Sequence, residues 1–539
     1  MTRKLFTIIS LLLALSIMTA CAGPAAAPTA APTAAPVATA APAATKAPAA
    51  TAVPAPTEPT GTVYTFAEGD TLADLAQKNL GNKDWFWAIY GLTNLKHNSD
   101  ASFTLISNPD KIAAGSQIYI PTQDEASAFM AKFDPKNPDL AMLFPKGASG
   151  QILVGNYWTS GGEFAGISGI YDLYRKQYPG VDIVHAGVAG GAGLNFQGLA
   201  LTKLQGGDPF DVMQMHVAKE VLLYDPEQYL TPLEDLVNET EGDVLPASLK
   251  DSLTVNGHIY SAPLNIHRGN VLWVNKKVLA DNGLTPPTTF AEFFKVADAL
   301  KAKGIVPLAM GGANQFEQRV LFETVLIGTL GPEGYMDLWS GKMSFKDAKV
   351  AEALNTYKKM LTYTNTDRDA LSWDQAVKLV IDDKAAMNIM GDWADGEFKN
   401  AGKTPDDYEG IPAPGNEGTF DLVSDSFALP LNAPNKENAV NFLKLISSKE
   451  AQEVFNINKG SICARTDCDY SKFDAYLQSS AADFKTSRVV PSFGANEATD
   501  PAWNSAMNDI IIKFSADGDV AAAQDALVKA AEDAGFPQP

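Results

Sequence analysis

From residue 151 onward, short apolar runs alternate with stretches of helical periodicity. Apolar runs at 152–154, 181–184 and 210–214 are separated by helical patterns, the first of them at 167–178. This alternation predicts α/β units around a mostly parallel sheet, in which ligands bind beyond the carboxyl ends of the strands.

Local signals in this region predict turns and helix ends. Asn256 and Gly257 lie between strand-like residues and predict a tight hairpin. Thr289 and Glu292 have the spacing of a capping box before an apolar helical face, and Gly304 stands where that helix should end.

The alternation resumes after Gly341. The pattern predicts helices at 350–361 and 373–382, a strand at 385–390, and one long helix at 437–455. We therefore expect two lobes, one built from about 151–265 plus a returning segment, and the other within about 266–420.

A smaller pattern occupies residues 61–122, which begin and end with strand-like alternation. Between these ends, one helical face carries Leu72 and Leu75, and a second apolar face carries Trp85 and Ile89. The segment is therefore expected to fold as strand, helix, helix, strand. Residues 123–149 have no clear repeat and are interpreted as a connector with one short helix.

The first sixty residues are of a different kind. Residues 1–20 combine two cations, a short apolar run and small residues, which is typical of an export signal. Residues 21–60 are nearly all Ala, Pro and Thr, a composition that buries no core and predicts an extended tether. Processing of the signal would leave Cys21 as the first residue.

Charge and cysteine usage narrow the partners and cofactors. The chain has 63 acidic and 42 basic residues, a net charge of −21, which argues against nucleic acid and against an anionic membrane surface as partners. Cys463 and Cys468 are close in an exported chain, so a small disulfide loop is plausible. The five histidines are scattered, and no metal site is expected.

Two N-terminal motifs resemble known families. Met18-Thr19-Ala20-Cys21 resembles a bacterial lipobox, which implies lipid attachment at Cys21 and a location on the outer face of the cell membrane. The alternative is an ordinary signal peptide followed by a cysteine.

Residues 61–122 resemble a LysM module, on the motifs Tyr64-Thr65, Glu68-Gly69-Asp70-Thr71-Leu72, Asn108-Pro109 and Gly115-Ser116-Gln117-Ile118-Tyr119-Ile120-Pro121. That resemblance implies binding to peptidoglycan, and the alternative is a degenerate spacer.

Residues 150–539 contain a third resemblance, to the extracellular solute-binding proteins of ABC sugar importers and, among them, to the glucose and mannose binders. Its motifs are Tyr157 to Glu163, Gly206 to Asp211, Asn265 to Trp273, Leu321 to Glu323, Met390 to Phe398 and Ser424 to Phe427. The implied fold is a two-lobed α/β periplasmic-binding-protein-like fold of type II that closes on a small sugar. Permease subunits on other chains are the implied partners, and no cofactor or catalytic residue is implied.

By this resemblance, the expected sugar-binding residues are Trp158, Glu163, Gln214, His216, His267, Asn270, Asp392, Trp393, Asp425 and Lys459. The polar groups would bond hydroxyls, Trp393 would stack on the ring, and Lys459 would reach the sugar from the far lobe. Trp158, Trp273 and Trp373 also have a competing interpretation as core or hinge packing.

One departure from the family pattern leaves the identity of the sugar open. Glucose-type members carry Ala-His-Gly in a late loop, whereas residues 491–497 hold no histidine, and Asn496 would have to replace that donor.

Two other functions remain as alternatives. A glycoside hydrolase needs two carboxylates across the scissile bond, and the sequence indicates no such pair. A wall scaffold would bind glycans only structurally.

Overall fold

The computed structural model describes residues 61–97, 100, 102–106, 109, 112–131, 150–178, 181–190 and 193–539. The predicted export signal, the tether, Cys21 and most of the predicted connector lie outside the described residues.

The small unit has the order predicted from the sequence. Strand β1 (Thr62–Thr65) pairs antiparallel with β2 (Gln117–Ile120), and α2 (Leu72–Leu80), η1 (Lys83–Trp85) and α3 (Phe86–His97) lie between them in the chain. Helix α2 begins at Leu72 because the Thr71 side chain accepts a hydrogen bond from the Asp74 amide. Leu72, Leu75 and Ile89 are buried in the core of this unit, as their periodicity predicts.

A further helix, α4 (Gln123–Met130), packs on α2 and α3. The Tyr119 hydroxyl donates a hydrogen bond of 2.7 Å to Glu125, which ties the last strand to this helix. The small unit therefore extends past the expected boundary at 122, and the one short helix expected in the connector belongs to it.

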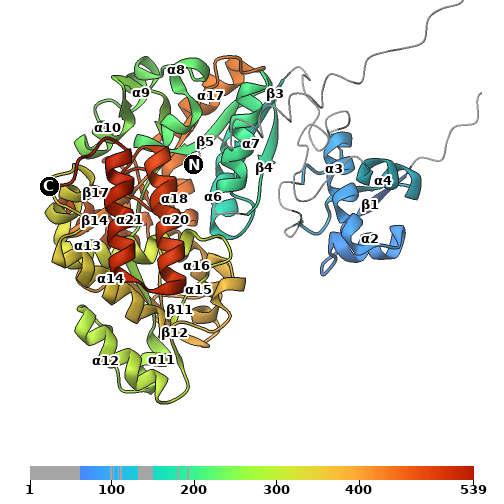
Figure 1. Cartoon of the computed structure of the whole chain (residues 1–539). Helices are drawn as coiled ribbons and strands as arrows, with labels where there is room; N and C mark the ends of the chain where they lie inside the picture. Colours follow the sequence, from blue (N-terminus) through green and yellow to red (C-terminus); the bar gives the residue numbers. More distant parts are fainter. Residues whose placement is uncertain are drawn as a thin grey trace, which may run out of the picture. The chain divides into compact units, whose positions relative to one another are not determined.

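The first lobe of the large unit is built on a five-stranded sheet with the order β4-β3-β5-β15-β8. Figure 1 labels β3, β4 and β5 of this sheet. Its strands are β3 (Gln151–Asn156), β4 (Asp182–Gly187), β5 (Val212–His216), β8 (Ser261–Pro263) and β15 (Asp425–Ala428). The first three are parallel and are connected by α6 (Gly161–Gln177) and α7 (Leu194–Gln205), whereas β15 runs antiparallel to β5 and β8. The predicted parallel α/β units are confirmed for β3, β4 and β5, but the sheet as a whole is mixed and not mostly parallel.

Several short elements complete this lobe. They are η3 (Ala218–Tyr224), α8 (Pro226–Tyr229), α9 (Glu234–Thr240), α10 (Ala247–Leu253), β6 (Thr254–Val255) and β7 (His258–Ile259). Strands β6 and β7 form the predicted hairpin, with φ of 52° at Asn256 and 85° at Gly257. These left-handed conformations suit Asn and Gly, which explains why the dipeptide marks the turn.

The helix expected at 437–455 is two helices in the structure. Helix α17 (Lys436–Ile446) ends before Ser447, and α18 (Lys449–Lys459) begins after Ser448, whose side chain accepts a hydrogen bond from the Ala451 amide. The prediction of one long helix is wrong because this cap starts a new helix within a continuous apolar pattern. Helix α18 packs against α6 of the first lobe.

The second lobe contains a four-stranded sheet with the order β11-β12-β10-β13. The strands are β10 (Val271–Asn275), β11 (Val306–Ala309), β12 (Ala385–Ile389) and β13 (Tyr408–Pro412). The helices are α11 (Lys276–Asp281), α12 (Phe290–Lys301), α13 (Phe316–Trp339), α14 (Ala348–Leu361), η4 (Arg368–Ala370), α15 (Trp373–Ile381) and α16 (Trp393–Asn400). The capping box of Thr289 and Glu292 is confirmed at the start of α12.

The C-terminal helices also belong to the second lobe. Helices α20 (Pro501–Asp517) and α21 (Val520–Asp533) pack against α13 and α14, and Figure 1 shows them beside these helices. Trp503 and Leu527 contribute to the same buried core as Phe322 and Leu354. The second lobe therefore reaches beyond the expected 266–420.

A third sheet, with the order β16-β9-β14-β17, lies where the chain passes between the lobes. Its strands are β9 (Asn265–Arg268), β14 (Thr419–Val423), β16 (Ile462–Cys463) and β17 (Arg488–Pro491). The chain runs from β8 through β9 to β10, returns from β13 through β14 to β15, and crosses again before α20. These crossing strands form the hinge region of a two-lobed protein.

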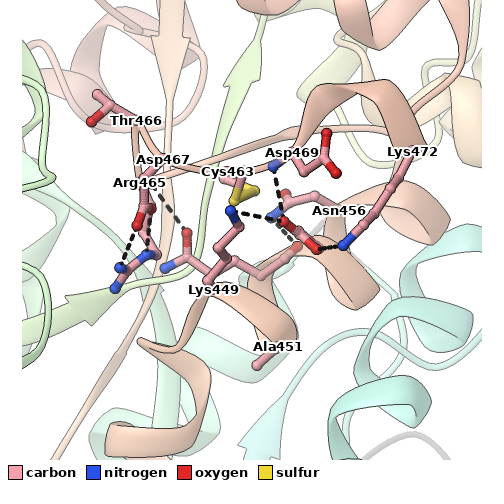
Figure 2. The surroundings of a disulfide bond; sticks show 12 residues. Lys449, Ala451, Asn456, Cys463, Arg465, Thr466, Asp467, Asp469 and Lys472 are labelled. Carbon is pink, nitrogen blue, oxygen red and sulfur yellow. Dashed lines mark hydrogen bonds and ion pairs between the residues drawn. A yellow bond between two sulfur atoms is a disulfide. The ribbon is translucent and has the colours of Figure 1, made fainter.

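A disulfide joins Cys463, the last residue of β16, to Cys468 (Figure 2). Arg465, inside this loop, donates hydrogen bonds to the carbonyl oxygens of Thr240 and Ser447, so the loop is anchored to the first lobe. The next segment includes η5 (Tyr470–Lys472) and leads to α19 (Ala475–Thr486). The loop thus fixes the chain that follows α18, the helix that ends at Lys459.

None of the helices in the described part of the chain combines the length and the apolar character that crossing a membrane requires.

Candidate functional site

A cavity of about 270 Å³, called the central cavity below, lies between the two lobes next to the crossing sheet. It is lined by Tyr157, Thr159, Ser160, Glu163, Ala189, Gly190, Gly193, His216, His267, Asn314, Phe316, Ser372, Trp373, Asp374, Trp393, Val423, Asp425, Lys459 and Ala495. Many of these residues follow the carboxyl ends of β3, β4, β5, β11 and β12, where an α/β sheet presents its ligand-binding loops.

The first lobe contributes mainly polar groups. Glu163 lies in the first turn of α6, His216 ends β5, and Tyr157 follows β3. The Tyr157 hydroxyl lies 3.1 Å from His216 Nε2 and 3.4 Å from Asp425 Oδ1, so the tyrosine joins these two groups at the cavity wall. Sequence reasoning assigned no role to Tyr157.

The second lobe contributes the aromatic wall. Trp393 follows β12, Phe316 starts α13, and Trp373 starts α15. The Trp393 ring lies 5.9 Å from the Phe316 ring and 5.3 Å from the His267 ring, measured between centroids. Trp373 both lines the cavity and packs against the buried core cluster that contains Trp273 and Trp393, so its interpretation as a packing residue holds in part.

Asp425 is the most extensively hydrogen-bonded acid of the cavity. Its Oδ1 accepts a hydrogen bond of 2.8 Å from Gln214 Nε2, and its Oδ2 accepts one of 2.8 Å from Asn265 Nδ2. His267 Nε2 lies 3.3 Å from Oδ2. Burial alone would raise the pKa of Asp425, but the His267 hydrogen bond and the nearby cations hold that pKa well below its usual range. The cavity therefore contains a fixed carboxylate.

Lys459 and Glu163 form a buried ion pair, with 2.9 Å between Lys459 Nζ and Glu163 Oε1. Burial raises the pKa of Glu163, and the charge of Lys459 opposes that shift. Lys459 ends α18, which packs on α6 of the first lobe. The expectation that Lys459 reaches the cavity from the far lobe is therefore wrong, because the lysine and Glu163 come from the same lobe.

His216 is held between two acids. Its Nδ1 lies 2.8 Å from Glu220 Oε2, and its Nε2 lies 3.7 Å from Asp425 Oδ1. Burial lowers the pKa of His216, but the Glu220 and Asp425 carboxylates outweigh that effect and leave the pKa above its ordinary value. The imidazole is therefore favoured as a hydrogen-bond donor toward the cavity.

Six of the ten expected residues line the central cavity, namely Glu163, His216, His267, Trp393, Asp425 and Lys459. Two others lie directly behind it. Gln214 is fully buried and donates to Asp425, and Asp392 is fully buried and hydrogen-bonds His267 Nδ1 and the Arg268 amide. These two residues orient cavity groups, and the structure does not place them at the cavity surface.

Trp158 and Asn270 lie away from the cavity. Trp158 is fully buried against Phe427 and Phe455 in the core of the first lobe, as its competing interpretation predicted. The Asn270 side chain hydrogen-bonds Asn416 and the Thr419 carbonyl oxygen. Neither side chain is part of the cavity lining, because Trp158 packs in the core and the Asn270 amide is hydrogen-bonded to other buried groups. Trp273 is fully buried, as expected for a core residue.

The loop at residues 491–497, where Asn496 was expected to replace the histidine donor, also differs from the expectation. Asn496 does not line the central cavity, since its side chain hydrogen-bonds Arg319 and Glu220, and its neighbour Ala495 lines the cavity in its place. Within the described residues, no group of three or more His, Cys, Asp or Glu side chains is arranged to hold a metal ion.

The sequence and the fold both match known proteins. The family model for bacterial extracellular solute-binding proteins matches residues 158–453. The chain is 33% identical over 385 residues to an uncharacterized ABC transporter extracellular-binding protein of Pyrococcus horikoshii, covering 70% of this chain and 87% of that protein. It is 32% identical over 393 residues to a probable sugar-binding periplasmic protein of Mesorhizobium japonicum, covering 70% of this chain and 93% of that one.

Among solved structures, the bacterial solute receptor AcbH superposes with a TM-score of 0.64 at 18% identity, covering 72% of this chain and all of the receptor. This likeness confirms the two-lobed periplasmic-binding-protein-like fold. The relatives are binding proteins and not enzymes, which removes support from the hydrolase alternative. With a family model that matches more than half of its length, the chain belongs to the bacterial extracellular solute-binding proteins.

Proposed function

We propose that the chain captures a small sugar in the central cavity and delivers it to an ABC transporter. The proposal rests on one observation, that the central cavity has a polar wall and an aromatic wall. One wall presents Glu163, His216 and Asp425, and the other presents Trp393 and Trp373. A pyranose has hydroxyls that seek charged partners and a C–H face that packs on an aromatic ring, so it complements both walls.

Individual roles follow from the contacts of each side chain. Asp425 and Glu163 accept hydrogen bonds from hydroxyls, His216 and His267 donate to them, and Trp393 stacks on the ring. Lys459 Nζ lies within 6.0 Å of the Trp393 ring centre, so a hydroxyl at the edge of a stacked sugar comes within its reach.

The size of the cavity favours a monosaccharide such as glucose or mannose. Pockets for drug-sized ligands span roughly 300–1,000 Å³, and the central cavity, at about 270 Å³, lies below that range. The probable sugar-binding relative of Mesorhizobium japonicum supports a sugar as the ligand class.

Isothermal titration calorimetry of the full chain with glucose, mannose, galactose, xylose and chito-oligosaccharides tests this proposal. One sugar is expected to bind at a single site with micromolar or tighter affinity, about −8 kcal/mol. Asp425→Asn and Trp393→Ala should each weaken that binding by about 30-fold, equivalent to about 2 kcal/mol. The matched control is Asp281→Asn at an exposed aspartate, which should bind like the wild type. Absence of heat with every sugar would overturn the proposal.

We also propose that the receptor is anchored by lipid at Cys21 on the outer face of the cell membrane. The lipobox-like residues before Cys21 and the Ala/Pro/Thr tether after it support this anchor. Metabolic labelling with a fatty-acid analogue should mark the wild type and leave Cys21→Ala unlabelled. Label in the variant would contradict the anchor.

The small unit is proposed to bind peptidoglycan as a LysM domain. Its strand, helix, helix, strand order and its antiparallel β1–β2 pair support this assignment. The full chain should sediment with insoluble peptidoglycan, and a chain lacking residues 61–131 should stay in the supernatant. Equal sedimentation of the two chains would favour the spacer alternative.

A further inference from the structure

The start of helix α6 in the first lobe is capped by a side chain of the second lobe. Within residues 150–178, the Ser160 side chain stands at the N-cap position and makes no capping hydrogen bond. The first backbone N–H groups of a helix have no partner inside the helix. One of them, the Gly162 amide, donates a hydrogen bond of 3.0 Å to Glu397 Oε1. Since Glu397 lies on α16, this cap crosses from one lobe to the other.

Glycines allow the carboxylate to reach the helix end. A Cβ on Gly161 would lie 1.8 Å from Glu397 Oε1, and Gly161 has a φ of 59°, in the left-handed region. A Cβ on Gly162 would lie 2.6 Å from Cα of Gly396, the residue before Glu397. Helix α16 therefore approaches the first turn of α6 at backbone distance, and Glu397 fills the space beside Gly161.

Helix α16 also contacts the end of α18, which packs on α6. Lys399 Nζ donates a hydrogen bond of 3.1 Å to the carbonyl oxygen of Ile457, in the last turn of α18. A carboxylate is favourable at the N-terminus of a helix and an ammonium group at the C-terminus, because of the helix dipole. The second-lobe helix thus presents an acid to the start of α6 and a base to the end of α18.

The same two helix ends carry the ion pair of the central cavity. Glu163 follows Gly162 in the first turn of α6, and Lys459 is the last residue of α18. Both line the cavity, and their charged groups lie 2.9 Å apart. Glu397 is not part of that lining, so it can affect a bound sugar only through the residues that it holds in place.

We propose that Glu397 is a positioning residue for the sugar site, which caps α6 across the lobe boundary and thereby holds Glu163 in its place in the cavity. Because the cap and the helix belong to different lobes, the first turn of α6 has its cap only in the arrangement of the lobes seen here. The effect on sugar binding rests on the proposed function, whereas the cap itself does not.

Hydrogen exchange of the full chain without sugar tests the cap. In a peptide that covers residues 156–166, Glu397→Ala should exchange the first-turn amides of α6 about tenfold faster than the wild type, because a lost cap frees the helix end. Glu397→Gln keeps a side-chain oxygen that can accept the Gly162 hydrogen bond and should exchange nearly like the wild type. The matched control is Glu333→Ala, at an exposed glutamate of the second lobe, which should leave this peptide unchanged. Unchanged exchange in Glu397→Ala would overturn the proposal, whether or not a sugar binds.

A double-mutant cycle on sugar affinity tests the positioning role. Calorimetry with glucose, or with mannose if glucose gives no heat, should show binding about tenfold weaker in Glu397→Ala than in the wild type. In a Glu163→Gln background the same change should weaken binding less than twofold, because Glu397 acts through Glu163. Equal losses in the two backgrounds would overturn the positioning role. If the wild type binds neither sugar, the proposed choice of sugar fails, and the exchange result alone decides whether Glu397 holds α6.

Discussion

Replacing Lys459 by methionine should destabilise the sugar-free protein strongly. The lysine is 3% exposed and lies 2.9 Å from Glu163, whose side chain is 15% exposed. Methionine fills similar space but leaves the Glu163 carboxylate buried without its cation. Breaking a buried ion pair by removing one partner costs about 3–5 kcal/mol, so the free energy of unfolding at pH 8 should fall by about that amount.

The loss of stability in Lys459→Met should be larger at high pH than at low pH. Burial raises the pKa of Glu163 above its unfolded value, and Lys459 opposes this rise. A carboxyl group with a raised folded pKa contributes stability at low pH, which is lost as pH rises through that pKa. Without Lys459 the pKa rises further, and each added unit is worth about 1.4 kcal/mol. The difference in free energy of unfolding between Lys459→Met and the wild type should therefore be larger at pH 8 than at pH 5.

Urea denaturation followed by circular dichroism at pH 5 and pH 8 measures both effects. Adding Glu163→Gln to Lys459→Met should recover much of the loss, because the buried charge is then gone. The matched control is Lys444→Met, which breaks the exposed pair with Glu239 and should cost less than about 1 kcal/mol. Equal losses at both pH values, or no recovery in the double variant, would refute the reasoning.

Three further outcomes are expected. A Cβ on Gly162 would lie 2.6 Å from Cα of Gly396 on the other lobe, so Gly162→Ala should lower stability by about 1–3 kcal/mol in thermal denaturation, and an unchanged melting temperature would contradict this. The raised pKa of His216 adds stability below about pH 6.5, and this stability is lost as pH rises through the folded pKa. The free energy of unfolding of His216→Gln should therefore change less between pH 6.5 and 8 than that of the wild type. Reducing the Cys463–Cys468 bond should cost about 2 kcal/mol for so short a loop, measured as a lower melting temperature in dithiothreitol.

The first lobe was predictable from the sequence because its strands and helices alternate locally. His216 ends β5 and Glu163 lies in the first turn of the helix that follows β3, and parallel strands bring their carboxyl ends to one edge. Trp158 shows the limit of this reasoning. Adjacent residues at a strand end point in opposite directions, so the chain register decides that Tyr157 faces the cavity and Trp158 faces the core.

The second wall of the cavity was harder to predict. Phe316 and Trp373 lie on α13 and α15, helices that meet the cavity only after the second lobe has assembled. No local pattern distinguishes such an aromatic residue from a core residue. The break between α17 and α18 has a similar cause, since Ser448 is an ordinary polar residue until it caps α18.

The three passages of the chain between the lobes have a consequence for biogenesis. The first lobe requires β15, which follows nearly all of the second lobe in sequence, and the second lobe requires α20 and α21 at the C-terminus. Neither lobe is a continuous stretch of polypeptide, so neither can finish folding while the chain is still being delivered. Such long-range contacts slow folding. A chain that folds slowly stays unfolded for longer, which suits the export across a membrane that the sequence of residues 1–20 predicts.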